Sequence, residues 1–298
     1  MIPAVPASTI PLHRRLALRA LRVLPGSTSY KFQIYHGLTT ALGPREKLAR
    51  PFFGGRMRCD LDDVIGKYIY HFGVWEPHIT AFMQRRLRPG DVFCDIGSHI
   101  GYYSLLASRA VGPSGAVVAV EAAPWIYAAL MENLRLNRAE NVRPVNVAVA
   151  ARAGTIALYR GPGRNAGMTT VVASRGFESA GQVPARPLFD ILTDSECARL
   201  RLIKLDVEGA EGAVLADIAG RIDRLPRALE IVAEISGKKD AKVDAAFARF
   251  MAAGYALYEI PNSYNPRTYL KYTGPEAPVP LRLPFSVQKD VLISRDPR

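Results

Sequence analysis

An aspartate and two glycines in this chain have the spacing of a turn that binds a nucleotide-like ligand. Asp95 closes an apolar run, and Gly97 and Gly101 follow before a second apolar stretch. The pattern predicts a buried strand, a tight turn and a helix. Glycine lets the backbone approach a ligand without a Cβ in the way, and the first turn of a helix offers unpaired N–H groups. The dinucleotide fingerprint would need glycine at His99 and glycine or alanine at Tyr102, so the spacing argues against that class of cofactor.

A carboxylate stands where the sugar of such a ligand would bind. Glu121 comes 20 residues after Gly101 and ends the next apolar run. An acidic side chain at the end of the second strand of a βαβ unit can accept hydrogen bonds from both hydroxyls of a ribose. Alone, Glu121 would indicate only an exposed strand end; after this turn, we interpret it as the ribose ligand.

Further charged residues lie near the ends of two later strands. One apolar run is interrupted by Lys204 and ends at Asp206, with Glu208 two residues further on, and the next predicted strand carries Glu234 near its end. Open α/β sheets bind ligands at the carboxyl ends of their parallel strands, so we expect these carboxylates at the same edge as the glycine turn. The alternative is that Asp206 or Glu208 caps the helix that follows.

The composition is that of an ordinary globular protein with a strong positive charge. The chain has 298 residues, of which 49% are hydrophobic, enough for one large α/β domain with an N-terminal extension. No apolar stretch is long enough to span a bilayer, and the three cysteines show no metal-binding or disulfide spacing, so we expect a soluble protein of the reducing cytoplasm. The formal net charge of +12 favours an anionic partner, namely nucleic acid, a membrane surface or an acidic substrate. A generally arginine-rich composition would give the same charge without any partner.

Residues 12–24 predict a basic amphipathic helix. One side would carry Leu12, Leu16, Ala17, Ala20, Leu21, Val23 and Leu24, and the opposite side Arg14, Arg15, Arg19 and Arg22, with Leu18 and His13 as exceptions. Such a helix can pack on its own domain, lie on an anionic membrane or contact a partner subunit in a homo-oligomer. The sequence leaves these three outcomes open.

The pattern divides the chain into an extension, residues 1–74, and a larger domain, residues 75–298. In the extension, residues 56–61 and 68–72 look like short strands that pair as a hairpin or cap. In the larger domain, Pro77 fits the first turn of a helix, after which strands and helices alternate.

Two long segments interrupt this alternation. Residues 161–187 are rich in Gly, Ser, Arg and Pro, which predicts a long irregular connection. Residues 261–285 contain three tyrosines among repeated prolines, which is typical of a loop that covers a substrate and equally of a loop that packs on the surface.

Four segments together resemble one known family. They are D-I-G-S-H-I-G-Y-Y-S, V-V-A-V-E-A, L-I-K-L-D-V-E-G-A-E and A-E-I-S, and they resemble the FkbM family of S-adenosylmethionine-dependent methyltransferases over residues 75–295. The resemblance implies a Rossmann-like α/β fold of class I methyltransferases. This fold has a seven-stranded, mostly parallel sheet flanked by helices, here with an N-terminal helical and β-hairpin extension. It also implies O-methylation of a hydroxyl on a sugar, glycan or polyketide-type natural product.

The resemblance assigns roles to individual residues. It implies that the methionine part of S-adenosylmethionine is held by Asp95, Gly97, Ser98 and Gly101, its ribose by Glu121, and its amino-acid end by Glu76. His99, Ala122 and Ala148 complete the cofactor-binding set. Ser98 and His99 replace the alanine and asparagine that the family usually has in the turn.

Methyl transfer to an alcohol requires alignment of the acceptor and gains rate from a base that takes the hydroxyl proton. We expect Asp206 to be this base, with Glu234 as the alternative and Glu208 nearby. Lys204 would hold Asp206 ionised or meet an anionic substrate.

Three other functions stay open at this point. Asp206, Glu208 and Glu234 offer oxygen ligands for a metal that assists O-methylation, although the sequence requires no metal. RNA methylation would suit the positive charge, but the chain reads D-V-E-G where base-directed enzymes carry an N-P-P-Y-like motif. A non-catalytic scaffold that only binds the cofactor is the third.

Overall fold

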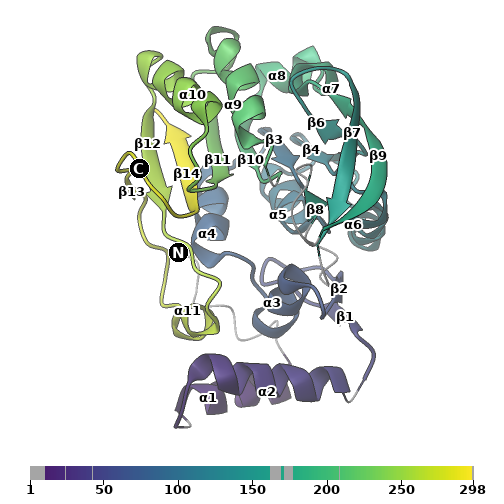
Figure 1. Ribbon diagram of the computed structural model, residues 1–298. Coiled ribbons are helices and arrows are strands. Elements are labelled where there is room, and N and C mark those ends of the chain that lie inside the picture. The colour runs from purple at the N-terminus through teal and green to yellow at the C-terminus, as the bar shows by residue number, and fades with distance from the viewer. Residues whose placement is uncertain are drawn as a thin grey trace. The chain divides into compact units, whose positions relative to one another are not determined.

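Strand β3, Val92–Ile96, forms from the apolar run before the glycine turn and lies inside a large sheet. The computed structural model describes residues 11–23, 25–41, 43–161, 169–170, 177–207 and 209–296. The chain forms two compact units (Figure 1). We call Met1–Phe82 with Asn262–Glu276 the N-terminal unit, and Met83–Pro261 with Ala277–Arg298 the sheet unit. The domain boundary expected after residue 74 stays a prediction.

The sheet unit contains an eight-stranded sheet in the order β13-β12-β14-β11-β10-β3-β4-β5. Its other strands are β4 Ala116–Val120, β5 Val142–Val145, β10 Leu200–Leu205, β11 Glu230–Ile235, β12 Ala256–Ile260, β13 Val279–Pro280 and β14 Lys289–Ser294. β11, β10, β3, β4 and β5 are parallel, and β14 lies antiparallel between β11 and β12. The mostly parallel α/β sheet implied by the resemblance is confirmed, with the two-residue strand β13 added at one edge.

Helices cover both faces of this sheet (Figure 1). They are α5 Tyr102–Val111, α6 Pro124–Asn137, α7 Leu188–Ile191, α8 Asp194–Ala198, α9 Glu211–Gly220, the 3-10 helix Ile222–Arg224 and α10 Ala241–Ala252. α9 and α10 lie on one face, and α5 and α6 on the other. Val92, Cys94 and Ile96 of β3 enter the core that α9 and α10 help to form. Because side chains alternate along a strand, Asp95 points to the α5 face.

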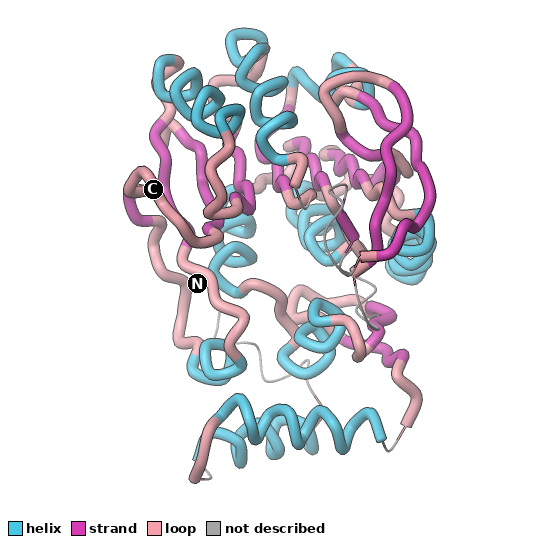
Figure 2. The backbone as a smooth tube through the Cα atoms, viewed as in Figure 1, coloured by secondary structure: helices cyan, strands magenta, loops and turns pink. Residues whose placement is uncertain are grey.

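The sheet unit also contains a second sheet, whose strands come after β5 in the chain (Figure 2). It comprises β6 Ala148–Val149, β7 Gly154–Arg160, β8 Thr169–Thr170 and β9 Glu178–Arg186, in the order β6-β9-β7-β8. The irregular connection expected over residues 161–187 is therefore wrong for its last part, where nine residues form β9. Gly181 and Pro184 hid this strand, since both residues are depleted in strands, but antiparallel pairing along β7 and burial of Val183 override that preference.

The N-terminal unit consists of helices and one short pair of strands. Its elements are α1 Leu12–Val23, α2 Thr28–Ala41, β1 Glu46–Ala49, β2 Met57–Asp60, α3 Val64–Phe72 and α11 Pro266–Lys271. Helix α4, Pro77–Arg86, begins at the proline where the sequence predicts a helix. No helix in the part of the chain that the structure describes is long and apolar enough to cross a membrane.

The hairpin expected between residues 56–61 and 68–72 is wrong, because residues 68–72 are helical. β2 pairs antiparallel with β1 instead. Asp63 caps α3 by accepting a hydrogen bond from the N–H of Gly66 at 2.8 Å, and Gly73, with φ 73°, ends the helix in the left-handed conformation. The cap at each end favours a helix, although the composition of the segment is typical of a strand.

The helix expected at residues 12–24 is confirmed as α1, but its buried side differs from the expected one. Leu18 and Leu21 are buried together with Arg14, whereas Leu16 and Val23 are exposed. Arg14 enters the buried side because its guanidinium donates to the carbonyl oxygen of Tyr70 at 2.6 Å and lies 4.0 Å from the centre of the Tyr70 ring.

A buried carboxylate ties together three elements of the sheet unit. Glu230, at the start of β11, is 3% exposed. Its oxygens lie 2.9 Å from Arg86 and 2.8 Å from Arg201, and it accepts a hydrogen bond from the hydroxyl of Ser294 at 2.6 Å. Both arginines therefore share this acid as a counter-charge.

Replacing Glu230 by alanine should lower the free energy of unfolding by about 3 kcal/mol, because two largely buried cations lose their counter-charge. Urea unfolding followed by circular dichroism measures this. Glu230→Gln keeps the shape of the side chain and one hydrogen bond, so its free energy of unfolding should lie between those of wild type and Glu230→Ala. Equal stability of wild type and Glu230→Ala would contradict the role of this cluster.

Candidate active site

The glycine turn closes against the backbone that follows strand β10. Gly97 and Gly101 have φ values of 83° and 88°, in the left-handed region that favours glycine. A Cβ on Gly97 would lie 1.7 Å from the carbonyl oxygen of Asp206, so no side chain fits there. The Asp206 N–H donates to the carbonyl of Ile96 at 2.9 Å, which joins the two strand ends directly. The structure thus brings together the glycine turn and the segment that ends at Asp206, as expected from the sequence.

Glu121 is held at this turn by the backbone. It is 7% exposed, and its two oxygens accept hydrogen bonds from the N–H groups of His99 at 3.0 Å and Ala123 at 2.9 Å. Burial raises the pKa of Glu121, and these N–H donors oppose that effect. Each carboxylate oxygen keeps a further lone pair, so the group can accept from a ribose diol.

Asp95 lies beneath the turn and is 1% exposed. The hydroxyl of Ser104, on α5, donates to its carboxylate at 2.6 Å. Burial raises the pKa of Asp95 to about 7, while the hydrogen bond from Ser104 and the charge of Lys204 act in the opposite direction. Ser104 was not predicted from the sequence; its place on the inner side of the helix, nine residues after Asp95, was the available signal.

Lys204 and Asp206 form an ion pair at the end of β10. The ammonium of Lys204 lies 3.2 Å from the Asp206 carboxylate and 5.8 Å from the centre of the Tyr103 ring. Lys204 is 1% exposed as a side chain, whereas Asp206 is 33% exposed. Helix α9 begins at Glu211 with Ala210 as its N-cap residue, so Asp206 does not cap it. Glu208 lies outside the described residues.

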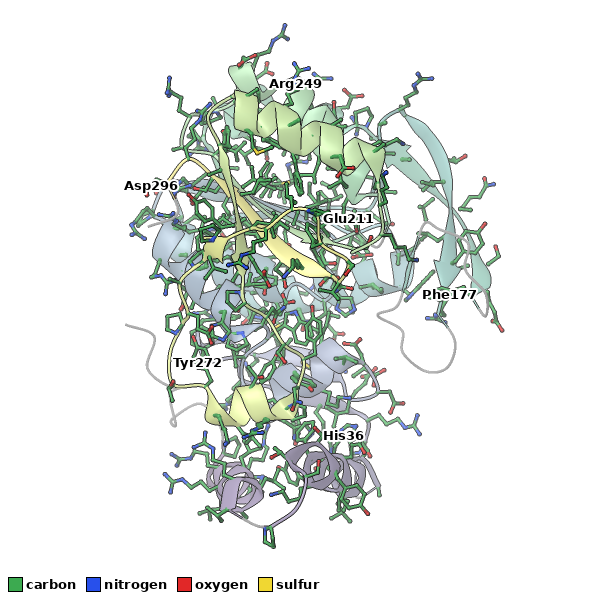
Figure 3. The ribbon with its side chains drawn as sticks, turned by 60° about the vertical axis from the view of Figure 1, so that its left-hand side comes forward. His36, Phe177, Glu211, Arg249, Tyr272 and Asp296 are labelled. Carbon is green, nitrogen blue, oxygen red and sulfur yellow. The ribbon has the colours of Figure 1, made fainter. Side chains whose placement is uncertain are left out.

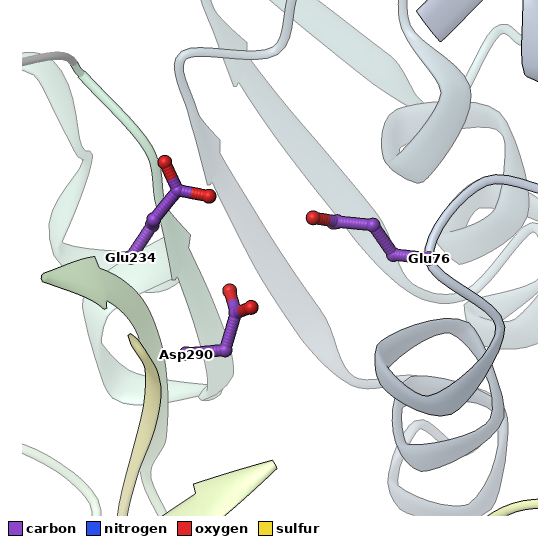
Figure 4. A group of neighbouring side chains, drawn as sticks. All are labelled: Glu76, Glu234 and Asp290. Atoms are coloured by element: carbon purple, nitrogen blue, oxygen red, sulfur yellow. The ribbon is translucent and has the colours of Figure 1, made fainter. Parts of the chain in front are cut away.

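Glu234 faces a carboxylate that the sequence analysis missed. β11 and β14 place Glu234 directly opposite Asp290, and Figure 4 shows both side chains on neighbouring strands. Neither belongs to the core on the α9 and α10 face, so both point to the same face as Asp95 and Lys204. Asp290 is the second residue of the antiparallel strand β14, and the N-terminal end of this strand lies beside the carboxyl ends of the parallel strands. An acidic residue at the start of the last strand was the signal that would have found it.

Glu76, also labelled in Figure 4, belongs to the N-terminal unit and is fixed within it. It is fully buried and has a φ of 40°, and its carboxylate accepts hydrogen bonds from Asn262 at 2.8 Å and from the Tyr264 hydroxyl at 2.7 Å. Its N–H donates to the hydroxyl of Tyr269 at 3.1 Å. Two tyrosines of the proline-rich segment 261–285, for which the sequence left a covering loop and a surface loop equally open, thus contact Glu76. Its role at the cofactor's amino-acid end stays a prediction.

The remaining predicted cofactor residues are wholly or partly buried, and their contacts with the cofactor stay predictions. Ser98 is 4% exposed, and its buried hydroxyl has no hydrogen-bond partner among the described residues. The same holds for the indole N–H of Trp125, the second residue of α6. Buried polar groups of this kind need a partner, which a bound polar ligand can supply. Ala122 is partly buried, and Ala148 is buried in the apolar cluster around Ala123. Unused donors, a buried acid and a turn with glycine at positions 97 and 101 together suit the amino-acid and ribose parts of S-adenosylmethionine.

The Asp95 pKa of about 7, against an ordinary value of 3.8, predicts a stability that falls with rising pH. Between these values the unfolded chain ionises at Asp95 while the folded protein keeps the proton, so the free energy of unfolding decreases through this window. Relative to Asp95→Asn, the free energy of unfolding of wild type should decrease by about 2–4 kcal/mol as the pH rises through this window. Urea unfolding of both proteins at a series of pH values measures the difference.

Ser104→Ala provides the internal check on this prediction. The Ser104 hydroxyl favours the ionised carboxylate, so its removal should raise the pKa of Asp95 further and extend the loss of stability to higher pH. A constant stability difference between wild type and Asp95→Asn across the window would refute the raised pKa.

Comparison with known proteins identifies the family of the chain. A family model, the methyltransferase FkbM domain, matches residues 95–255, which is 161 of the 298 residues. A curated relative, Methyltransferase sdnD of Sordaria araneosa, is 31% identical over 153 residues, covering 42% of this chain and 59% of that protein. The chain thus matches less than two thirds of that relative's length.

Two solved structures are similar at low identity. One is TYW2 of M. jannaschii in complex with AdoMet, with a TM-score of 0.44, 14% identity and coverage of 84% of this chain and 85% of that chain. The other is precorrin-6y C5,15-methyltransferase of Geobacter metallireducens GS-15, with a TM-score of 0.39, 15% identity and coverage of 73% and 87%. The family model alone spans more than half of the sequence. The chain belongs to the FkbM family of S-adenosylmethionine-dependent methyltransferases.

Proposed function

We propose that this methyltransferase methylates a hydroxyl oxygen of a sugar, glycan or polyketide-type natural product, with Asp206 as the general base. The observation that carries the proposal is the double role of Asp206. Its backbone packs against Gly97 in the cofactor turn, and its carboxylate is one third exposed beside the buried ammonium of Lys204. A carboxylate so placed stands next to the cofactor and remains accessible to an acceptor.

The chain's own residues would perform three tasks. The turn at Gly97 and Ser98 binds the amino-acid part of S-adenosylmethionine, and Glu121 binds its ribose. This cofactor supplies an activated methyl group on a sulfonium, so that the acceptor needs only alignment and deprotonation. Asp206 accepts the hydroxyl proton, while Lys204 orients the carboxylate through their 3.2 Å contact.

The acceptor's class follows from the charges around this position. Lys204 is buried and basic, and the chain as a whole carries a net charge of +12. Lys204 is ion-paired with Asp206, so support for an acceptor that also carries a carboxylate or phosphate comes only from the positive charge of the whole chain. The carboxylates of Glu234 and Asp290 on the same sheet face can accept hydrogen bonds from further hydroxyls of a polyhydroxylated acceptor.

Replacing the Glu121 carboxylate by an amide should weaken binding of S-adenosylmethionine at least tenfold, or about 1.4 kcal/mol, because one acceptor oxygen becomes an NH2 donor and the negative charge is lost. Isothermal titration calorimetry of wild type and Glu121→Gln measures the affinity, and Glu140→Gln, at an exposed turn, serves as the control. Equal affinity of wild type and Glu121→Gln would remove Glu121 from the cofactor site.

Asp206→Asn should lower methyl transfer by a factor of about 10²–10⁴, because the amide cannot take the acceptor's proton. Transfer of a radiolabelled methyl group to a panel of hydroxylated sugars and polyketides measures turnover, and calorimetry should show unchanged cofactor affinity. If turnover stays within a few fold, the base is a different residue, and Glu234→Gln tests the alternative.

The same assay separates the proposed mechanism from a metal-assisted one. Asp206 and Glu234 would supply oxygen ligands in the latter case, so treatment with a chelator would abolish turnover and added Mg²⁺ would restore it. The proposed mechanism predicts full activity in the chelator.

A further inference from the structure

The first two helices expose an unusual amount of apolar surface. Eleven large hydrophobic side chains of the described residues are exposed, and five of them lie on α1 and α2. These five are Leu16 at 53%, Val23 at 82%, Tyr30 at 66%, Ile34 at 48% and Leu38 at 57%. Apolar side chains gathered in this way mark a contact surface more often than apolar residues that are scattered singly.

On each helix the exposed side chains form one stripe. Leu16 and Val23 are seven residues apart, and Tyr30, Ile34 and Leu38 are spaced by four, so each set lies on one side of its helix. We call these two stripes the outer face. The opposite sides are the ones that pack inward.

Both inward sides pack on α3. Phe32 of α2 stacks on Phe72 with 5.1 Å between ring centres, and Arg14 of α1 binds the carbonyl and ring of Tyr70. His36, labelled in Figure 3, accompanies Phe32 on this side and lies 3.2 Å from a ring nitrogen of His71. Since both helices direct their buried sides to α3, both stripes of the outer face turn away from it. The N-terminal unit therefore satisfies its own core without them.

The charge around the outer face has one sign. No acidic residue occurs before Glu46. Arg19 and Arg22 are exposed, and on the helix they lie beside the stripe of Leu16 and Val23. Arginines flanking an apolar stripe can extend their guanidinium groups to phosphates while their methylene stems cover apolar surface.

From this pattern we infer that the outer face of α1 and α2 binds the surface of an anionic lipid bilayer. The apolar stripes would enter the boundary between headgroups and acyl chains, with the Tyr30 hydroxyl at the headgroup level and the arginines on lipid phosphates. A second copy of the chain is a poor occupant, because a symmetric contact would place arginines against arginines without one carboxylate on either side. The inference is independent of the methyl acceptor.

Co-sedimentation with vesicles tests this inference on the full-length protein. Wild type should bind vesicles containing roughly one third phosphatidylglycerol in phosphatidylcholine, bind weakly to pure phosphatidylcholine, and lose affinity as salt is raised. The double variant Leu16→Gln, Val23→Gln tests the apolar stripe, and Arg19→Glu, Arg22→Glu tests the charge. Each should lower vesicle affinity at least about tenfold.

A matched control comes from the sheet unit. Arg249 and Met251 are an exposed basic and an exposed apolar residue near the end of α10, where Figure 3 labels Arg249. The variant Arg249→Glu, Met251→Gln should bind vesicles as wild type does. All variants should keep the wild-type circular dichroism and affinity for S-adenosylmethionine, since they touch neither the core nor the cofactor turn.

Several results would overturn the inference. They are no vesicle binding by wild type, equal binding to neutral and anionic vesicles, or undiminished binding by both helix variants. Size-exclusion chromatography with light scattering tests one further outcome. A wild-type oligomer that Leu16→Gln, Val23→Gln dissociates would show that a second copy covers the outer face.

Discussion

The backbone contact between Gly97 and Asp206 holds the two halves of the candidate site together. A Cβ at Gly97 would lie 1.7 Å from the Asp206 carbonyl oxygen, so β3 and β10 can end side by side only with glycine at this position. The contact sets the distance between the cofactor turn and the acid that we assign as base. Glu121 joins the same arrangement through the backbone of His99. The geometry of the turn therefore depends on main-chain atoms, and the contact between His99 and Glu121 does not require a particular side chain at position 99.

Strand periodicity explains how four charged side chains reach one sheet face. Asp95, Lys204, Glu234 and Asp290 come from adjacent strands, and each alternates with residues that enter the opposite core. Lys204 is buried beside the carboxylates of Asp206 and Asp95, and ion pairing offsets part of the cost of removing its charge from water. The same burial leaves Asp95 with a pKa of about 7, poised between neutral and ionised forms. The face combines fixed opposite charges with one group that responds to pH.

Local sequence signals were sufficient for the parallel core and the cofactor turn, where strand, glycines and helix lie within residues 92–111. They failed where distant pairing decides the structure. Asp290 gains its place from antiparallel registry with Glu234, and β9 forms despite a glycine and a proline because β7 offers a partner along its length. Arg14 is buried because Tyr70 supplies both an acceptor and a ring face. Each of these depends on a residue far away in the sequence, which periodicity cannot detect.

The family match and the chain's individual features lie in different parts of the sequence. The matched region, residues 95–255, contains the cofactor turn and the Lys204–Asp206 pair but not Glu76 or the segment that surrounds it. That segment, Asn262–Glu276, leaves the sheet unit after β12 and packs in the N-terminal unit, where it holds Glu76 buried at a positive φ. Strained, fully hydrogen-bonded carboxylates persist only where the surroundings enforce them, and such residues cluster at functional sites. The regions outside the matched residues therefore contain a second buried carboxylate, Glu76, whose position depends on contacts with residues that lie 186 and 188 positions away in the sequence.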